Sequence, residues 1–192
     1  MTILLVTLVS AWPLIWLLGL TGWRQLPVLL LMLVWAAVPV AWSSVALLAA
    51  FGIQAPSLVA AGMVIMLMLA RAGRAPSLPV DEARLIAMGV MLAGALWYGS
   101  ALLPALPDLH GLGWGSFQFS TGLLLVGLAS WVIRAYHACL LLVIAQAGFA
   151  LELLPAANLW YYLVDPLLLM VAPLWLLASV WPAQSSTKTG SA

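Results

Sequence analysis

Long apolar runs separated by short polar segments dominate the pattern along this chain. Continuous runs rich in Leu, Ala, Val and Met predict membrane-spanning helices, whereas the strands of a membrane barrel alternate polar and apolar residues over about ten positions. The polar breaks divide the chain into about seven runs. The pattern therefore predicts an all-α fold, a polytopic transmembrane helical bundle of about seven spans with no soluble domain.

Polar and proline-containing breaks set the limits of the predicted spans. The most polar segment, residues 71–84, is expected to form a loop, and its Asp81 is expected to cap the helix that follows. Residues 1–182 then form a single transmembrane domain, and residues 183–192 a polar, disordered cytoplasmic tail. The expected spans are 3–20, 27–50 with a bend at Pro39, 56–70, 83–103, two within 119–154, and 166–181.

Length decides the number of spans between Phe119 and Leu154. These 36 residues contain no proline, and one helix rising about 1.5 Å per residue would be about 54 Å long. The hydrocarbon core is about 30 Å thick, which fits two spans of about 18 residues. We therefore expect a turn at residues 134–137, with Arg134 at the membrane interface, where an arginine costs less than at mid-bilayer. One long helix is the alternative.

The basic residues provide an independent test of the number of spans. Seven spans place successive loops on alternating sides of the membrane, and Lys and Arg gather on the cytoplasmic side. With seven spans, every basic residue falls on the same side. The six residues are Arg24, Arg71, Arg74, Arg84, Arg134 and Lys188. The distribution therefore predicts an outside N-terminus and a cytoplasmic C-terminus.

Composition supports a membrane protein and excludes several other classes. The chain is 66% hydrophobic and only 6% charged, whereas soluble domains carry about 25% charged residues. Five arginines against one lysine, with abundant Leu, Ala and Trp, favour a bacterial origin. We expect a multi-pass protein of the bacterial inner membrane. A net charge of +1 without a basic patch argues against nucleic acid, and the single cysteine, Cys139, excludes an internal disulfide or a cysteine cluster.

Polar residues of the predicted outer face are the candidates for transport or ion binding. They are Asp108, His110, Glu152 and Asp165. Glu152 ends the sixth expected span, where it is either a proton or cation site on a transport path or a solvated carboxylate at headgroup depth. Asp165 precedes Pro166, which favours an N-cap. The alternative start of this helix is Asn158. If Asp165 is not a cap, it faces Glu152 across a short loop, and the two carboxylates share a proton or hold a cation.

A second group of polar residues is assigned structural roles. Gln146 lies in the middle of a span and is expected to pair with another helix, an interaction of about 0.6 to 2 kcal/mol. Arg134 and Asn158 complete this group. His110 and His137 are expected on opposite sides of the membrane, so they cannot bind a metal or haem together. We therefore predict no metal, no cofactor and no catalytic residue.

Tryptophans and small residues indicate the surroundings of the helices. Most of the 11 tryptophans fall near expected helix ends, which is typical of aromatic belts at both interfaces; lining of a ligand cavity is the alternative. Small residues four apart let helices approach closely and bind other membrane subunits. The pairs are Gly89 with Ala93 and Ala95 with Gly99.

The sequence leaves several functions open. An accessory or assembly subunit of a membrane complex needs only packing surfaces, and a compact transporter or pore would use the acidic outer face as a vestibule. A membrane-embedded enzyme that acts on lipid with Asp108, His110 and Glu152 is an alternative. A phage- or plasmid-encoded lysis or exclusion protein is another. With no catalytic motif in the chain, an enzyme is the weaker hypothesis.

Overall fold

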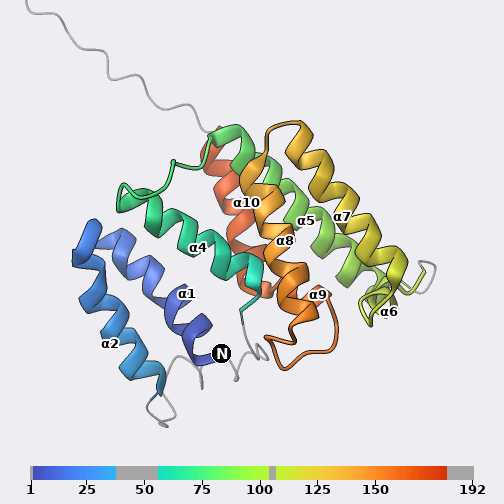
Figure 1. Cartoon of the computed structure of the whole chain (residues 1–192), viewed down its shortest axis with the longest axis horizontal. Helices are drawn as coiled ribbons and strands as arrows, with labels where there is room; N and C mark the ends of the chain where they lie inside the picture. Colours follow the sequence, from blue (N-terminus) through green and yellow to red (C-terminus); the bar gives the residue numbers. More distant parts are fainter. Residues whose placement is uncertain (1, 38–55, 104–106, 181–192) are drawn as a thin grey trace, which may run out of the picture.

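The computed structural model describes residues 2–37, 56–103 and 107–180, and this part of the chain is helical without strands (Figure 1). Seven helices have twelve or more residues: α1 (Thr2–Leu17), α2 (Leu26–Ala37), α4 (Leu58–Arg71), α5 (Val80–Leu102), α7 (Phe117–Val132), α8 (Tyr136–Ala150) and α10 (Pro166–Val180). Three short elements connect them: the 3₁₀ turn η1 (Gly22–Gln25), α6 (Leu109–Leu112) and α9 (Trp160–Leu163). The all-α prediction is confirmed.

Each expected span corresponds to one of these seven helices, but most of the helices are shorter than a membrane span. Among the described residues, only α5 is long and apolar enough to cross a membrane by length and composition, and six further apolar helices have 10–17 residues. The seven-span bundle therefore remains a proposal. The expected bend at Pro39, the remainder of the second span to residue 50, the tail and Lys188 lie outside the described residues.

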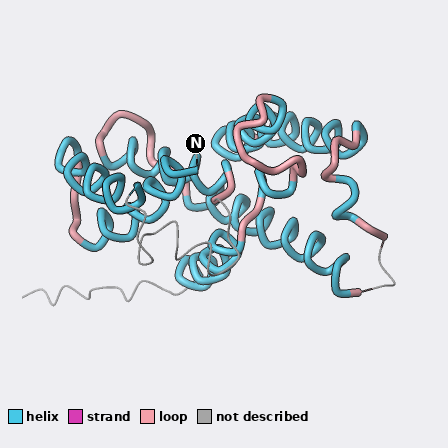
Figure 2. The backbone as a smooth tube through the Cα atoms, turned by 90° about the horizontal axis from the view of Figure 1, so that it is seen from below, coloured by secondary structure: helices cyan, strands magenta, loops and turns pink. Residues whose placement is uncertain are grey.

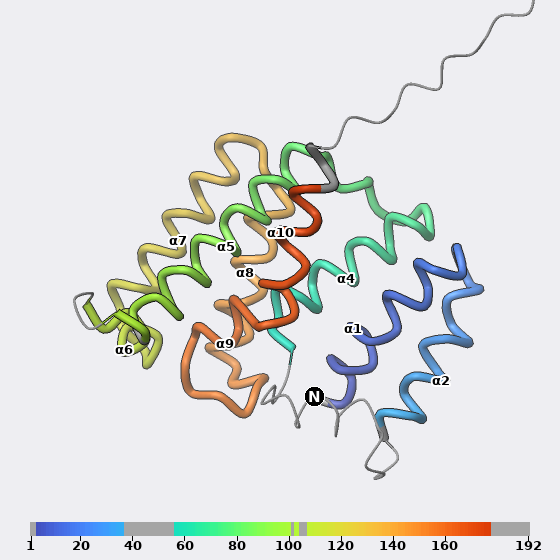
Figure 3. Tube along the Cα trace, turned by 180° about the vertical axis from the view of Figure 1, so that it is seen from behind, coloured from blue at the N-terminus to red at the C-terminus, as the bar shows by residue number. Residues whose placement is uncertain are grey.

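The helices form a row that is covered on one side by a pair. Along the row, α2 packs on α1, α1 on α4, α4 on α8 and α8 on α7. The pair α5 and α10 packs together, and α5 also contacts α8. Seen from behind, α5 and α10 lie over α7 and α8 (Figure 3), and the view from below shows helices joined by loops, without strands in the described part (Figure 2). Non-consecutive helices thus lie next to one another.

The expected turn between residues 119 and 154 is confirmed. Helix α7 ends at Val132 and α8 begins at Tyr136. Arg134 has a φ of 66°, a left-handed conformation that glycine usually supplies at the end of a helix. The N–H groups of Ala135 and Arg134 donate to the carbonyls of Ser130 (2.8 Å) and Trp131 (3.0 Å), which is the Schellman pattern. Arg134 takes the left-handed position that glycine usually fills, so the turn forms without a glycine.

The N-terminus of α5 differs from the prediction. Asp81 was expected to cap this helix, but the N-cap residue is Pro79, so Asp81 lies inside the first turn together with Glu82. The prediction was wrong by two residues because Pro79 already has the extended conformation of a cap, with φ −61° and ψ 143°. Asp81 instead pairs with Arg84 at 3.4 Å on the surface. The shift matters because it turns Glu82, rather than Asp81, toward α8.

Alternating helix directions place all described arginines at one end of the bundle, together with Asp81 and Glu82, and the other three acidic residues at the opposite end (Figure 1). The connections α1–α2, α4–α5 and α7–α8 lie at one end, here called the arginine end. It carries, in or next to these connections, Arg24, Arg71, Arg74, Arg84 and Arg134. The other end, here called the acidic end, carries Asp108, Glu152 and Asp165. The sequence pattern of basic residues is therefore a spatial pattern as well.

Candidate functional site

The candidate residues of the acidic end do not form one site in the described part of the chain. Asp165 is only 3% exposed, whereas Asp108 and Glu152 are exposed. No hydrogen bond or ion pair joins any two of these three carboxylates among the described residues. The geometry therefore gives no support to a shared proton or a cation between Glu152 and Asp165.

Asp165 caps two helices at once. One carboxylate oxygen accepts the N–H of Leu168 at 2.9 Å, which is the N-cap arrangement expected from an Asp-Pro pair at the start of α10. The other oxygen accepts the N–H of Ser57 at 2.8 Å, a residue 108 positions earlier in the chain. Ser57 in turn caps α4 by accepting the N–H of Ala60 at 3.1 Å. Asp165 thereby ties the beginnings of α4 and α10 together.

Asp108 and His110 belong to the short helix α6. Asp108 caps α6 by accepting the N–H of Gly111 at 3.0 Å, so it is a solvent-exposed cap. The ring of His110 stacks on Trp97 at 6.2 Å between centroids, and its Nε2 lies 3.4 Å from the amide nitrogen of Asn158. The histidine is therefore held against aromatic and amide groups rather than paired with Asp108.

Asn158 connects α6 to the segment that precedes α9. This fully buried residue donates from its amide to the His110 carbonyl at 3.1 Å and accepts the N–H of Trp160 at 3.0 Å. The Leu159 N–H donates to the Gly113 carbonyl at 2.8 Å. A side chain at Gly113 would collide with the Asn158 amide, so the close approach requires glycine here. These contacts hold α6 against the segment that precedes α9.

An aromatic cluster forms the interior of the acidic end. Trp97 and Trp160, 6% and 4% exposed, stack at 6.1 Å with an interplanar angle of 8°, and Phe119 packs on Trp160 at 4.6 Å. The Trp160 indole donates to the Leu109 carbonyl at 2.8 Å. These two tryptophans belong to the core, whereas Trp16, Trp23, Trp114 and Trp131 are more than half exposed near helix ends. The belt prediction thus describes only part of the set.

Glu152 ends α8 in the same way that Arg134 ends α7. It has a φ of 51°, its N–H donates to Phe149 at 3.0 Å, and the next N–H, of Leu153, donates to Gly148 at 3.0 Å. Arg134 and Glu152 are the only non-glycine residues with positive φ among the described residues. Both residues are exposed, one shortly before the start of α8 and the other directly after its end.

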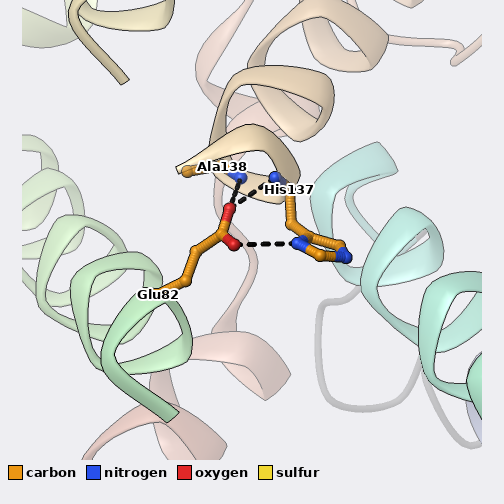
Figure 4. A network of polar contacts seen from close by, with 3 residues as sticks. All are labelled: Glu82, His137 and Ala138. Atoms are coloured by element: carbon orange, nitrogen blue, oxygen red, sulfur yellow. Dashed lines mark hydrogen bonds and ion pairs between the residues drawn. The ribbon is translucent and has the colours of Figure 1, made fainter. Parts of the chain in front are cut away.

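The sequence did not single out Glu82, which makes the most connected polar cluster of the arginine end (Figure 4). Its carboxylate, in a residue only 8% exposed, accepts the backbone N–H groups of His137 and Ala138, the latter at 3.0 Å. The second oxygen lies 2.8 Å from Nδ1 of His137. Three contacts thus join α5 to the first turn of α8.

Glu82 supplies the cap that α8 lacks. The N-cap residue of α8 is Ala135, which has no side-chain acceptor and makes no side-chain cap bond. The first N–H groups of a helix need acceptors, and negative charge near a helix N-terminus is favourable. The absence of Ser, Thr, Asp or Asn before α8 is the one sequence signal that an acceptor must come from elsewhere. It does not say from which residue.

Gln146 lacks the hydrogen bond expected of it within the described residues, and the glycines of the small-residue pairs have open space around them. The amide nitrogen of Gln146 is buried and has no hydrogen-bond partner among the described residues, although pairing with another helix was expected. It lines a cavity of about 330 Å³ between α7 and α8. Gly89 and Gly99 contact no atom that a Cβ would meet within 4 Å, whereas Gly94 approaches Leu169 of α10. Within the described residues, the two glycines of the expected pairs therefore make no close helix contact, whereas Ala93 packs against the core.

The described residues hold no group of three or more His, Cys, Asp or Glu side chains placed to bind a metal ion. His110 lies at the acidic end in α6, and His137 lies at the arginine end in α8 (Figure 1). Comparison of the chain with protein-family models, with curated proteins and with solved structures finds no match. Its function is therefore argued from the geometry alone.

Proposed function

We propose that this chain is a multi-pass protein of the bacterial inner membrane that serves as an accessory subunit of a membrane complex. The observation that carries the proposal is the apolar outer surface of every long helix. Large apolar side chains are exposed on all seven; one example from each is Leu4, Leu30, Ile65, Leu92, Leu128, Val143 and Leu174. Soluble monomers rarely expose apolar patches of more than a few hundred Å².

The middle of α7 exposes several large apolar side chains. Four side chains in its middle, Leu124, Leu125, Val126 and Leu128, are 54–61% exposed. A surface helix of a soluble protein has one apolar face and one polar face, whereas a helix that is apolar all round belongs inside a protein or a membrane. Lipid chains keep such an apolar face away from water, so its exposure carries no free-energy penalty in a membrane.

The short helices are compatible with this environment. The six shorter helices have 12 to 16 residues in the described part. They are therefore about 18 to 24 Å long, less than the roughly 30 Å of a hydrocarbon core. A bilayer adapts to short spans by thinning, at fractions of a kcal/mol per Å. Gathering of all described arginines at one end supports the orientation, with the arginine end in the cytoplasm.

An accessory subunit accounts for the polar groups better than a transporter does. A transport path needs polar groups that a substrate can reach, whereas Asp165 is occupied by two backbone N–H groups and Asp108 by one. The outward face of α5 exposes Gly89 and Ala95, and the space beside Gly89 and Gly99 is open. Small residues at these positions let another helix approach α5 closely, beside larger exposed side chains such as Leu92.

Single-cysteine accessibility tests the membrane topology. In a Cys139→Ser background, cysteines at Ser116, Ala156 and Ser186 are probed in intact cells with a membrane-impermeant thiol reagent. We expect labelling at Ser116 and Ala156, which lie at the acidic end, and labelling at Ser186 only after the cells are opened. Labelling of all three positions in a soluble cell extract without detergent would refute the membrane proposal.

Blue native electrophoresis of mild-detergent extracts tests the accessory role. We expect the wild type to migrate well above its 20.4 kDa monomer and Gly89→Leu with Gly99→Leu to migrate as the monomer, because bulk prevents close packing of α5. Gly122→Leu on α7 is the matched control, since this glycine also has open space around it. A wild-type protein that migrates as a monomer would exclude the subunit role.

A further inference from the structure

The described parts of α1, α4, α5 and α10 enclose a cavity of about 680 Å³. This volume lies within the range of roughly 300–1,000 Å³ that is typical of small-ligand sites. Trp16 and Val171 line it and are 62% and 57% exposed, so the cavity opens to the surface. Neither Glu82 nor Asp165 belongs to its lining.

The walls of this cavity are apolar, with a single charged group. Three indoles, of Trp12, Trp16 and Trp175, line it together with aliphatic side chains of α4 and α5. Apart from the indole N–H groups, the polar side chains that the described residues contribute to the lining are those of Arg71 and Ser77, and none of the lining residues is a carboxylate. A ligand that fits must therefore be largely apolar and carry at most one negative group.

Arg71 is held in place without being neutralised. This last residue of α4 lies at the arginine end, with its guanidinium 5.1 Å from the centre of the Trp12 ring and 3.5 Å from the Ile15 carbonyl. No carboxylate of the described residues pairs with it. A guanidinium has five N–H donors in a planar fork that matches phosphate oxygens, so donors remain for a ligand.

We propose that this cavity binds an anionic phospholipid of the cytoplasmic leaflet, with the phosphate at Arg71 and an acyl chain against the three tryptophans. The inference rests on the proposed membrane location, because the arginine end then lies at headgroup depth. Basic pockets between membrane helices on the cytoplasmic side are suited to anionic headgroups. The indoles and the aliphatic walls provide the complementary surface for the chain.

Native mass spectrometry of the detergent-purified protein tests the site. The protein is mixed with equimolar phosphatidylglycerol and phosphatidylcholine of identical acyl chains, and the two singly bound species are compared. One arginine near the surface favours the anionic lipid by about fivefold. We expect this preference in the wild type and near-equal binding in Arg71→Gln. Arg74→Gln is the matched control, because Arg74 is an exposed arginine of the same connection that does not line the cavity.

A second variant tests the cavity rather than the charge. Val171→Trp adds bulk at an exposed lining position of α10. It is expected to reduce binding of both lipids, so that little preference between them remains. Equal binding of the two lipids by the wild type, or an equal loss of preference in Arg74→Gln and Arg71→Gln, overturns the inference. If the protein instead purifies from the soluble fraction without detergent, the proposed function fails first, which separates the two failures.

Discussion

Replacing Asp165 with alanine is expected to lower the free energy of unfolding by about 2 to 4 kcal/mol. Loss of an N-cap costs about 0.5 to 2 kcal/mol, and a buried N–H left without an acceptor costs about 1 to 3 kcal/mol. Asp165→Ala causes both, because the N–H groups of Leu168 and Ser57 lose their acceptor at a position that is 3% exposed. Titration of the detergent-solubilised protein with SDS, followed by circular dichroism, measures the loss.

Two further variants separate the joint cap from an ordinary one. Asp165→Asn keeps one acceptor oxygen, so we expect a loss of about half that of the alanine variant. Asp108→Ala removes the exposed cap of the four-residue helix α6 and should change the unfolding midpoint much less. Equal effects of Asp108→Ala and Asp165→Ala would contradict the assignment of Asp165 as the link between α4 and α10.

Replacing Glu82 with alanine is expected to have an effect of similar size, about 2 to 4 kcal/mol. The change leaves the N–H groups of His137 and Ala138 without an acceptor and removes the partner of the His137 ring. The first turn of α8 should then open before the rest of the bundle. Amide hydrogen exchange, read by mass spectrometry, should show faster exchange in α8 near residues 137 and 138 than in α4.

The adjacent residue Asp81 is the matched control for Glu82. Both are acidic residues of the first turn of α5, but the Asp81 side chain is 95% exposed and pairs with Arg84 on the surface. Exposed ion pairs contribute little to stability, so Asp81→Ala should leave both the unfolding free energy and the exchange in α8 near wild type. If Asp81→Ala and Glu82→Ala were equally destabilising, the effect would come from charge in the first turn of α5 and not from capping of α8.

The positions of the helices were predictable because apolar runs and their breaks are local features of the sequence. The Asp-Pro pair at residues 165–166 marked the start of α10, and length alone required a turn near Arg134. The exact geometry of that turn was not predictable, since the left-handed position holds an arginine instead of glycine. The end of a helix is usually marked by the residue that relieves backbone strain, and this marker is missing here.

The candidate site was predicted less well than the helices, because the contacts that use up a polar group are not local. Asp165 was expected to cap its own helix, but nothing near it in the sequence indicates that it also binds Ser57, 108 positions away. Glu82 and Asp81 are neighbours with the same charge, and only the phase of α5 decides which one faces α8. Of the three carboxylates expected to line a vestibule, Asp165 is buried and accepts two backbone N–H groups as a cap.

The sequence by itself determined the helical class, the position of each long helix to within a few residues in the described part, and the placement of the five arginines in alternate connections, because these depend on hydropathy and order along the chain. The tertiary structure decided which helices touch, which carboxylates cap a helix in another part of the chain, and where Arg71 meets an apolar cavity. Helix contacts in an apolar chain depend on the shapes of side chains that share one polarity, and the periodicity of such a chain does not distinguish the buried face from the exposed face.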